Sequence, residues 1–172
     1  MTSETISADP DIATDETEPL SSRFNRQLLT FKCSGRGFAV DIMDVREIRS
    51  WSRPTPLPHA PPHMLGMVNL RGSVLPVTDL AQRLGQAPTE DRQRNVIIVI
   101  QKKDRVHGLL VDAVSDIVTP SPDQLQDVPP IVGGNAPALA DFLFVIDEEM
   151  IQVLSMDSIL PEEGGGVRDM NE

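Results

Sequence analysis

The sequence predicts an all-β fold, a barrel or a sandwich, with only one or two short helices. Two observations predict this class: short apolar segments follow one another along the chain, and clusters of turn residues separate them. A third observation narrows the prediction, because a hairpin, a loop and a second hairpin recur in each half of the chain. This weak internal symmetry favours two small barrels.

The first hairpin is predicted from residues 29–31 and 38–42, on either side of a glycine-containing turn at 34–37. In both segments apolar side chains alternate with other residues, which is the period of a half-buried strand. Beyond this hairpin the spacing changes, since Val45 and Ile48 lie three residues apart. A short helical turn or an irregular strand is therefore expected there.

A second hairpin is predicted after a loop at residues 53–63, whose prolines cannot donate hydrogen bonds into a central strand ladder. Residues 67–70 and 73–77 form its strands, and the turn between them is Arg71-Gly72. A two-residue turn requires positive φ, which Gly72 adopts without strain.

A short helix is expected next, because Leu80 and Leu84 lie four residues apart on one helical face. Thr78 or Asp79 can cap its start, and Gly85 is placed to end it.

A third hairpin is predicted after a polar linker at residues 86–94. Its strands, 96–100 and 106–111, surround a polar turn at 102–104 and are apolar nearly throughout. A continuous apolar run of this length indicates a strand that is buried on both faces.

The last hairpin is predicted after a second loop rich in proline and glycine, at residues 119–137. It joins strand 142–146 to strand 150–154 through an acidic turn at 147–149. Asp157 can cap a final helical turn.

The formal charge of the 172-residue chain is −11, and most of it lies at the two ends. Residues 1–22 carry −6 and residues 162–172 carry −3, so both ends are predicted to be disordered acidic tails. The predicted folded domain, residues 23–161, carries only −2. An acidic chain without a basic face argues against nucleic acid and anionic membrane as partners.

No apolar run approaches the roughly 20 residues that cross a bilayer, and the first residues show no signal-peptide pattern. We therefore expect a cytoplasmic protein that does not insert into the membrane directly.

Residues that carry catalytic or metal chemistry are few. Cys33 is the single cysteine, so no internal disulfide or multi-cysteine metal site is expected, and a small buried side chain is its predicted role. His59 and His63 have the spacing of two zinc ligands on a helix, but Pro61 and Pro62 disfavour a helix there. Loop histidines are the favoured interpretation, and neither a metal nor a cofactor is predicted.

Two carboxylate pairs, Asp112 with Asp116 and Glu148 with Glu149, would serve acid–base catalysis only in a shielded cleft. The sequence gives no sign of such a cleft. Asp112 is therefore interpreted as a turn or cap residue, and no catalytic residue is predicted.

Three segments together resemble the CheW family, the coupling proteins of bacterial chemotaxis arrays. The most specific is GMVNLRGSVLPVTDLAQRLG at residues 66–85, with its Asn-Leu-Arg-Gly turn, apolar strand and Asp-Leu helix. The segments FAVDIMDVREI at 38–48 and HGLLVDAVSDIV at 107–118 resemble two further family elements in the same order. The resemblance covers about residues 25–160.

The resemblance implies two five-stranded SH3-like barrels packed together, and a protein that is not an enzyme. Members of the family bridge the cytoplasmic tip of a chemoreceptor, a methyl-accepting chemotaxis protein, to the regulatory domain of the histidine kinase CheA. The implied function is therefore that of an adaptor, associated with membrane receptor arrays through these two partners.

The resemblance also implies a receptor-binding site. The family places the arginine of the turn, here Arg71, at the receptor-binding groove, together with neighbouring turn residues Asn69 and Gly72. The positions of Glu47 and Val45 are implicated in the same contact. On the residues alone, Arg71 is a solvated turn residue, Glu47 forms a local surface pair, and Val45 packs in the core as readily as in an interface.

The sequence departs from the family at residues 141–142, where members usually carry a glycine just before the penultimate strand. At this departure the resemblance does not predict the edge of the second barrel or a partner contact that would use it. Two alternative functions also remain: an adaptor of the same fold in a chemosensory-like pathway that does not control flagella, and a β-barrel that binds a small ligand or acts as an enzyme through a groove between its barrels.

Overall fold

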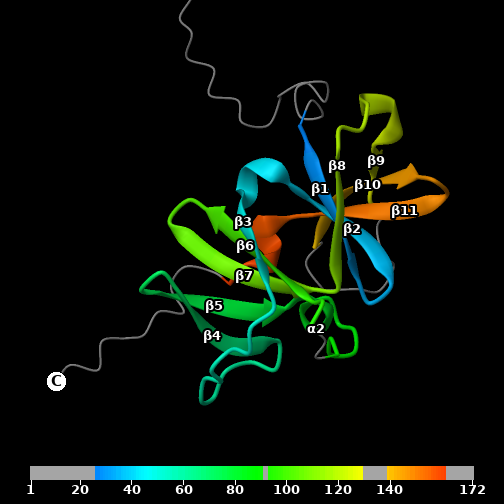
Figure 1. The fold of residues 1–172 in the computed structure, drawn as a ribbon. Coiled ribbons are helices and arrows are strands. Elements are labelled where there is room, and N and C mark those ends of the chain that lie inside the picture. The colour runs from blue at the N-terminus through cyan, green and yellow to red at the C-terminus, as the bar shows by residue number, and fades with distance from the viewer. Residues whose placement is uncertain (1–25, 91–92, 130–138, 162–172) are drawn as a thin grey trace, which may run out of the picture.

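A computed structural model of the chain describes residues 26–90, 93–129 and 139–161. The predicted tails at 1–22 and 162–172 lie outside the described residues, as does the later part of the predicted loop 119–137. The described residues form two small barrels of antiparallel hairpins, as the sequence predicts (Figure 1).

One barrel, here called the terminal barrel, takes its strands from both ends of the described chain (Figure 1). Its strands are β1 (Leu28–Cys33), β2 (Arg36–Asp41), β8 (Ala113–Val118), β9 (Gln126–Asp127), β10 (Ala140–Ile146) and β11 (Glu149–Leu154). They lie in the order β8-β1-β2-β11-β10-β9, and β2 and β11 pair in parallel. A short helix, α3 (Met156–Ile159), follows β11.

The other barrel, here called the central barrel, is continuous in sequence. Its strands are β3 (Val45–Ser50), β4 (Met64–Leu70), β5 (Ser73–Asp79), β6 (Val96–Lys102) and β7 (Arg105–Val111). They lie in the order β3-β6-β7-β5-β4, and β5 and β7 pair in parallel. The helix α2 (Leu80–Arg83) follows β5, and the 3-10 turn η1 (Ile42–Asp44) connects the two barrels.

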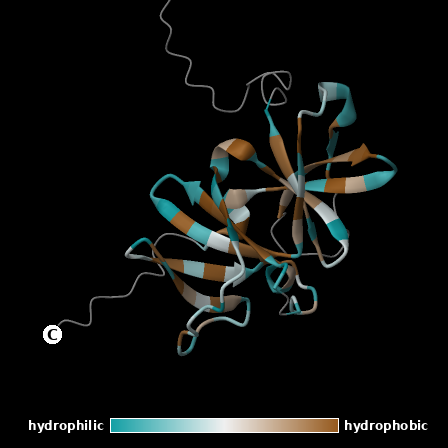
Figure 2. Ribbon diagram, in the orientation of Figure 1, coloured by the Kyte–Doolittle hydropathy of each residue, from teal (hydrophilic) through white to brown (hydrophobic). Residues whose placement is uncertain are grey.

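Three apolar cores hold this arrangement together. Each barrel has an inner core, and a third core fills the junction between the barrels. Along β6 the side chains alternate between two of them: Ile97 and Val99 face the inside of the central barrel, while Ile98 and Ile100 face the junction. Hydrophobic residues accordingly follow one another along β6, whose sequence is VIIVIQK (Figure 2). Burial of each such side chain stabilises the fold by about 1.5–3 kcal/mol.

All four predicted hairpins are confirmed, and so is the strand pair buried on both faces. The segment after the first hairpin contains both predicted alternatives, first the turn η1 and then the strand β3 with a register shift between Val45 and Glu47. Asp79 caps α2, because its carboxylate accepts a hydrogen bond from the Ala81 N–H at 3.2 Å.

Three features differ from the sequence prediction. The barrels do not follow the two halves of the chain, because the parallel pairing of β2 with β11 joins the first hairpin to the last. The strand β8, which the sequence did not indicate, pairs with β1. Asp157 does not cap the last helix, because the helix begins earlier and Ser155 occupies its N-cap position. The Ser155 backbone is extended, and its N–H donates a hydrogen bond to the Leu139 carbonyl at 2.8 Å.

The departure from the family at Asp141 falls inside β10. The register of β10 against β11 shifts between Ala140 and Phe142, so Asp141 is the extra residue of a β-bulge. A bulge accommodates an additional residue without ending the strand.

Candidate partner-binding surface

The predicted turn Arg71-Gly72 is the tip of the β4–β5 hairpin. Both residues have positive φ, 51° for Arg71 and 84° for Gly72, as a two-residue turn between twisted strands requires. Asn69 stabilises the turn, because its Oδ1 accepts a hydrogen bond from the Gly72 N–H at 2.9 Å. Asn69 and Gly72 therefore shape the turn, and they present an Arg71 side chain that is 75% exposed.

Glu47 of β3 lies beside this tip. Its Oε2 is 3.4 Å from a guanidinium nitrogen of Arg71, and its Oε1 accepts a hydrogen bond from Arg49 at 3.2 Å. A pair with one partner this exposed contributes little to folding stability. The structure thus brings together two predicted site residues that are distant in sequence, in a contact that a competing carboxylate can replace.

Glu47 lies on β3, and Arg71 directly follows β4; these two strands are the opposite edges of the central sheet. A second link between these edges comes from Thr55 in the proline-rich loop, which exchanges two backbone hydrogen bonds of 2.8 Å with Met67 of β4. The loop approaches so closely that a Cβ on Gly66 would lie 2.1 Å from the Thr55 carbonyl oxygen, and Gly66 has a φ of 143°. The glycine before the Asn-Leu-Arg-Gly turn is therefore required for closing the barrel.

Val45 is half-buried and packs against the junction core, so part of its role is structural. Two apolar side chains that the sequence analysis missed are more exposed: Ile48 of β3 at 47% and Val74 of β5 at 65%. The alternation of exposed and half-buried residues along β3 could have indicated Ile48, but the Val45–Ile48 spacing obscured it.

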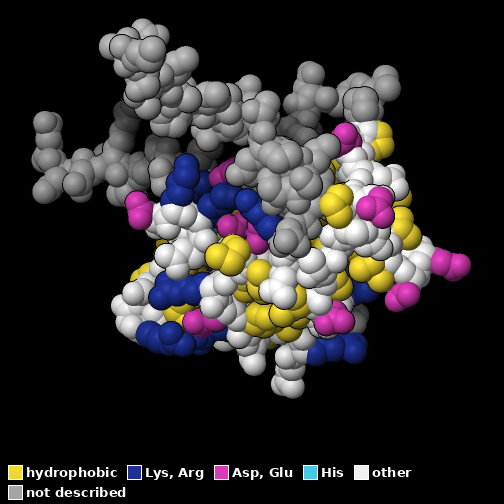
Figure 3. Space-filling model, turned by 90° about the horizontal axis from the view of Figure 1, so that it is seen from above, with side chains coloured by type: hydrophobic (Ala, Val, Ile, Leu, Met, Phe, Trp, Pro, Cys, Tyr) yellow, Lys and Arg dark blue, Asp and Glu magenta, His cyan; other side chains and the backbone are white. Residues whose placement is uncertain are grey.

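A groove of about 750 Å³ borders both barrels, near the start of β3. Its floor includes apolar residues of the terminal barrel, among them Leu28, Phe142 and Leu154, and Met43 of η1 lies at its edge. In the space-filling view, apolar side chains gather on the face of the molecule between acidic and basic groups (Figure 3). The sequence analysis named a groove between the barrels only as an alternative ligand site and predicted none of its residues.

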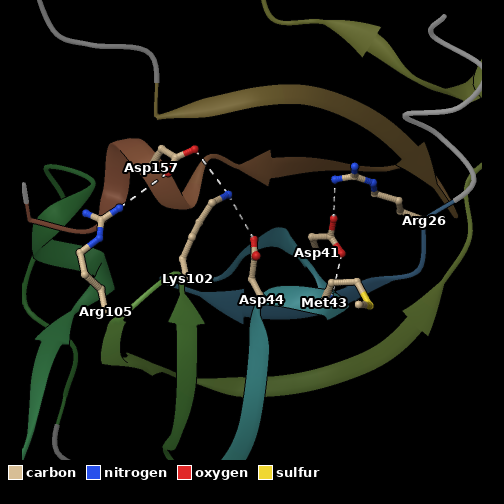
Figure 4. Close-up of polar contacts among 7 residues, drawn as sticks. All are labelled: Arg26, Asp41, Met43, Asp44, Lys102, Arg105 and Asp157. Atoms are coloured by element: carbon tan, nitrogen blue, oxygen red, sulfur yellow. Dashed lines mark hydrogen bonds and ion pairs between the residues drawn. The ribbon is translucent and has the colours of Figure 1, made fainter. Parts of the chain in front are cut away.

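Charged side chains from both barrels meet beside the groove (Figure 4). The Lys102 Nζ lies 3.7 Å from Asp44 and 3.4 Å from Asp157, and Arg105 lies 3.7 Å from the other oxygen of Asp157. Burial raises the pKa of Asp44, while the nearby Lys102 charge opposes that shift. The cationic end of β6 therefore links η1 to helix α3.

Helix α3 is held to the central barrel by two arginines. The Arg83 guanidinium donates to the carbonyls of Ser158 at 2.7 Å and Ile159 at 3.2 Å, and Arg105 donates to the Pro161 carbonyl at 2.8 Å. Cations suit the end of a helix, where carbonyls lack partners within the helix. These contacts, with the shared junction core, set the position of the two groove walls.

The other sequence candidates do not assemble into a reactive site. Cys33 is 1% exposed, and burial, with the charge of Asp112, raises the pKa of its thiol to about 12. His59 is exposed and His63 half-buried in the proline-rich loop. Within the described ranges, no three His, Cys, Asp or Glu side chains are grouped as a metal site requires.

The sequence analysis also missed a buried polar pair. The Nε2 of His107 lies 2.6 Å from the Thr78 hydroxyl, on the face of the central sheet that is turned toward the junction core. Burial lowers the pKa of His107 to about 4, with smaller contributions from His63 and Arg105. An apolar strand gives no sign that its one histidine will find a hydroxyl partner across the sheet.

A search of the described residues for an apolar helix long enough to cross a membrane finds none.

Comparison with known proteins identifies the family of the chain. Residues 27–164 match the family model described as CheW-like domain. The chain is similar to the chemotaxis protein CheW of Rhizobium meliloti (strain 1021), with 47% identity over 80% of this chain and 89% of the relative. It is also 44% identical to a probable chemotaxis protein CheW of Rhizobium etli over the same shares.

A solved structure shares the fold. The crystal structure of the scaffolding protein TtCheW from Thermoanaerobacter tengcongensis superposes with a TM-score of 0.72 at 25% sequence identity, covering 81% of this chain and 95% of that protein.

Proposed function

The chain belongs to the CheW-like family, and on this premise we propose that it is a chemotaxis scaffold that couples a chemoreceptor to a histidine kinase. Its place among CheW scaffold proteins follows from the family match and from the shared fold. The proposal adds the two partners: the cytoplasmic domain of a methyl-accepting chemotaxis protein and the regulatory domain of the kinase CheA. It also holds that the chain acts without catalysis, in the cytoplasm, and reaches receptor arrays through these partners.

The contact between Arg71 and Glu47 carries the proposal. The guanidinium is presented on a hydrogen-bonded turn, and it pairs with the half-buried Glu47 while its own side chain stays 75% exposed. A planar guanidinium binds a carboxylate through two hydrogen bonds, so an acidic side chain of a receptor helix can take the place of Glu47.

The segment from Met43 to Glu47 extends this surface. Met43 and Asp44 border the groove, Val45 packs below them, and Glu47 reaches Arg71. A helical partner that fills the groove with apolar side chains would therefore meet the Arg71 tip as it leaves the groove. This combination of an apolar anchor region and a charged rim is typical of protein–protein interfaces.

Calorimetric titration with a chemoreceptor cytoplasmic fragment tests the proposal. We expect Arg71→Glu to weaken binding at least about tenfold, because two like charges then face each other at residues 47 and 71 and the cation is lost. The thermal melt should stay nearly unchanged, since an exposed turn residue contributes little to stability. A large drop in melting temperature would make Arg71 structural instead.

A matched control lies at the tip of the β10–β11 hairpin. Glu148→Lys also reverses a charge on a two-residue turn with positive φ, but at a distance in sequence and on the other barrel. It should leave receptor binding unchanged. The two substitutions change the net charge in opposite directions, so equal losses would mean that disturbance of any exposed turn, and not loss of the Arg71 contact, weakens binding.

Capture of the kinase regulatory domain tests the second partner. The wild-type chain should bind this domain and the receptor fragment together, as a coupling protein must. Binding to neither would contradict the proposal. Binding to the kinase of a chemosensory pathway that does not control flagella would keep the adaptor role and change the pathway.

A further inference from the structure

Met43 is the most exposed large apolar side chain among the described residues, at 82%. It belongs to η1, the three-residue turn between the barrels, and lies at the edge of the groove. A single exposed apolar side chain is common on protein surfaces, but Met43 borders the same groove as the apolar residues Leu28 and Phe142, and an apolar surface shared by several residues is typical of an interaction site.

The turn holds Met43 at this position through its backbone. The Met43 N–H donates to an Asp41 carboxylate oxygen at 2.9 Å, and the other oxygen of Asp41 pairs with Arg26 at 3.1 Å (Figure 4). Asp41 therefore fixes the start of the turn, and the thioether sulfur extends from a defined place on the groove edge.

The other described sulfur atoms are less accessible or lie elsewhere. Cys33 is buried, and oxidants react with a thiolate, which a thiol with a pKa of about 12 does not form at neutral pH. Met156 is 2% exposed, and Met64 and Met67 are half-buried. Met150 is 56% exposed, but it lies on β11 and does not border the groove.

From this arrangement we propose that Met43 is a site of reversible oxidation, and that its sulfoxide weakens the binding of an apolar partner segment at the groove. Hydrogen peroxide supplies the oxygen. The sulfur lone pair attacks one peroxide oxygen, the S–O bond forms as the O–O bond breaks, and the proton of the attacked oxygen passes to the departing hydroxide to give water. The sulfur loses two electrons, and the peroxide gains them.

Oxidation changes the character of the groove edge. A flexible apolar thioether becomes a polar sulfoxide, which disrupts apolar contacts and is reversed by sulfoxide reductases that consume a dithiol. The effect on binding rests on the proposed receptor contact at this groove, whereas the oxidation itself depends only on exposure. Because burial of a methionine side chain contributes substantially to an interface, we expect about a tenfold loss of affinity.

Peroxide titration followed by peptide mass mapping tests the modification. The purified full chain is treated with increasing hydrogen peroxide, and the rate of oxygen addition is measured separately for each methionine. We expect Met43 to react ahead of Met150, with Met64 and Met67 slower and Met156 slowest. A Met43 rate no higher than that of buried Met156 would overturn the proposal.

Titration with the chemoreceptor fragment then tests the consequence. The chain is oxidised and the peroxide is removed. The receptor affinity of the oxidised chain is then compared with that of the untreated chain and with that of an oxidised sample that methionine sulfoxide reductases A and B have reduced again. We expect about a tenfold loss that the reductases restore. Met43→Leu should have the affinity of the untreated wild-type chain, both before and after peroxide treatment. Met150→Leu should lose affinity on oxidation, as the wild-type chain does.

The outcomes separate this inference from the proposed function. If the untreated chain binds the receptor and oxidation of Met43 leaves the affinity unchanged, the inference is wrong and the scaffold function stands. If the untreated chain does not bind the receptor at all, the proposed receptor contact is wrong, and with it the consequence assigned to oxidation. A loss of affinity that also occurs in Met43→Leu would place the sensitive residue elsewhere and overturn the inference.

Discussion

The terminal and central barrels have the same strand pairings in a different chain order. In each, a single strand pairs with a hairpin, the hairpin pairs in parallel with a second hairpin, and a short helix follows the last strand of that second hairpin. Strands β3 to β7 of the central barrel correspond to β8, β10, β11, β1 and β2 of the terminal barrel. The two barrels are therefore related by a circular permutation, which explains the weak symmetry seen in the sequence.

The barrels differ in the kinds of contact that stabilise them. The central barrel uses polar and backbone contacts: the buried His107–Thr78 pair, the Asp79 cap and the Thr55 bridge. In the terminal barrel, Phe38 of β2 lies opposite Phe31 of β1, and the two rings stack with their centroids 6.1 Å apart. One topology is thus compatible with a polar and an apolar solution, and the polar one is the more sensitive to single substitutions.

Glycine substitutions should give the largest difference in unfolding free energy between the two barrels. At Gly66 a Cβ would meet the Thr55 backbone, and the φ of 143° is strained for any other residue, so Gly66→Ala should cost about 4 kcal/mol. At Gly37 of the terminal barrel the nearest atom is the Ile151 side-chain end at 2.3 Å, which can rotate away. Gly37→Ala should therefore cost about 1–2 kcal/mol. Urea unfolding measures both, and equal costs would mean that the Thr55 bridge is dispensable.

The caps of the two helices provide the next comparison. Asp79 is 1% exposed and accepts hydrogen bonds from Ala81 and from both the backbone and the hydroxyl of Thr89, at 2.8 Å and 2.6 Å for the latter two. Asp79→Ala should cost about 3 kcal/mol, because buried donors lose their partner. Ser155 makes no side-chain cap bond, so Ser155→Ala should cost less than about 0.5 kcal/mol. Urea unfolding measures both costs. A similar loss of unfolding free energy in the two variants would mean that the Asp79 cap is no more important than the Ser155 position.

The buried histidine predicts a pH dependence that belongs to the central barrel. The pKa of His107 falls from 6.5 to about 4 on folding, so the unfolded chain binds more protons between these values. This contribution to stability is complete above about pH 6.5 and is lost as the pH falls toward 4. From pH 7 to pH 5 the loss should be about 2 kcal/mol. His107→Gln should flatten the stability curve in this window relative to wild type, and parallel curves would contradict the prediction.

Removal of residues 1–22 should have the smallest effect. These residues precede the terminal barrel and hold −6 of the −11 formal charge, while the specific contacts proposed for binding lie at Arg71 and the groove. Receptor affinity of the truncated chain should therefore stay within about twofold of wild type at physiological salt, where distant charges are screened. A larger loss would make the segment part of the binding surface.

Local features of the fold were predictable because a few neighbouring residues determine them. The alternation around 38–42, the Arg71-Gly72 turn and the cap at Asp79 each express a preference of the chain over two to five positions. The strand β8 was missed because its sequence, AVSDIV, is largely exposed and lacks the apolar alternation of the other strands. The proposed partner-binding roles of Arg71, Glu47, Val45, Asn69 and Gly72 all came from the family resemblance.

By itself, the sequence determined the class of fold, the hairpins and their turns, and the presence of an exposed arginine on one of those turns. Only the tertiary structure decided which hairpins share a barrel, that Glu47 meets Arg71, and that Met43 borders a groove on the terminal barrel, where Lys102 of the central barrel also reaches it. The reason is that backbone hydrogen bonds across a parallel pair such as β2 and β11 are alike for any two strands. The choice between partner strands therefore comes from the packing, in three cores, of side chains that are distant from one another in sequence.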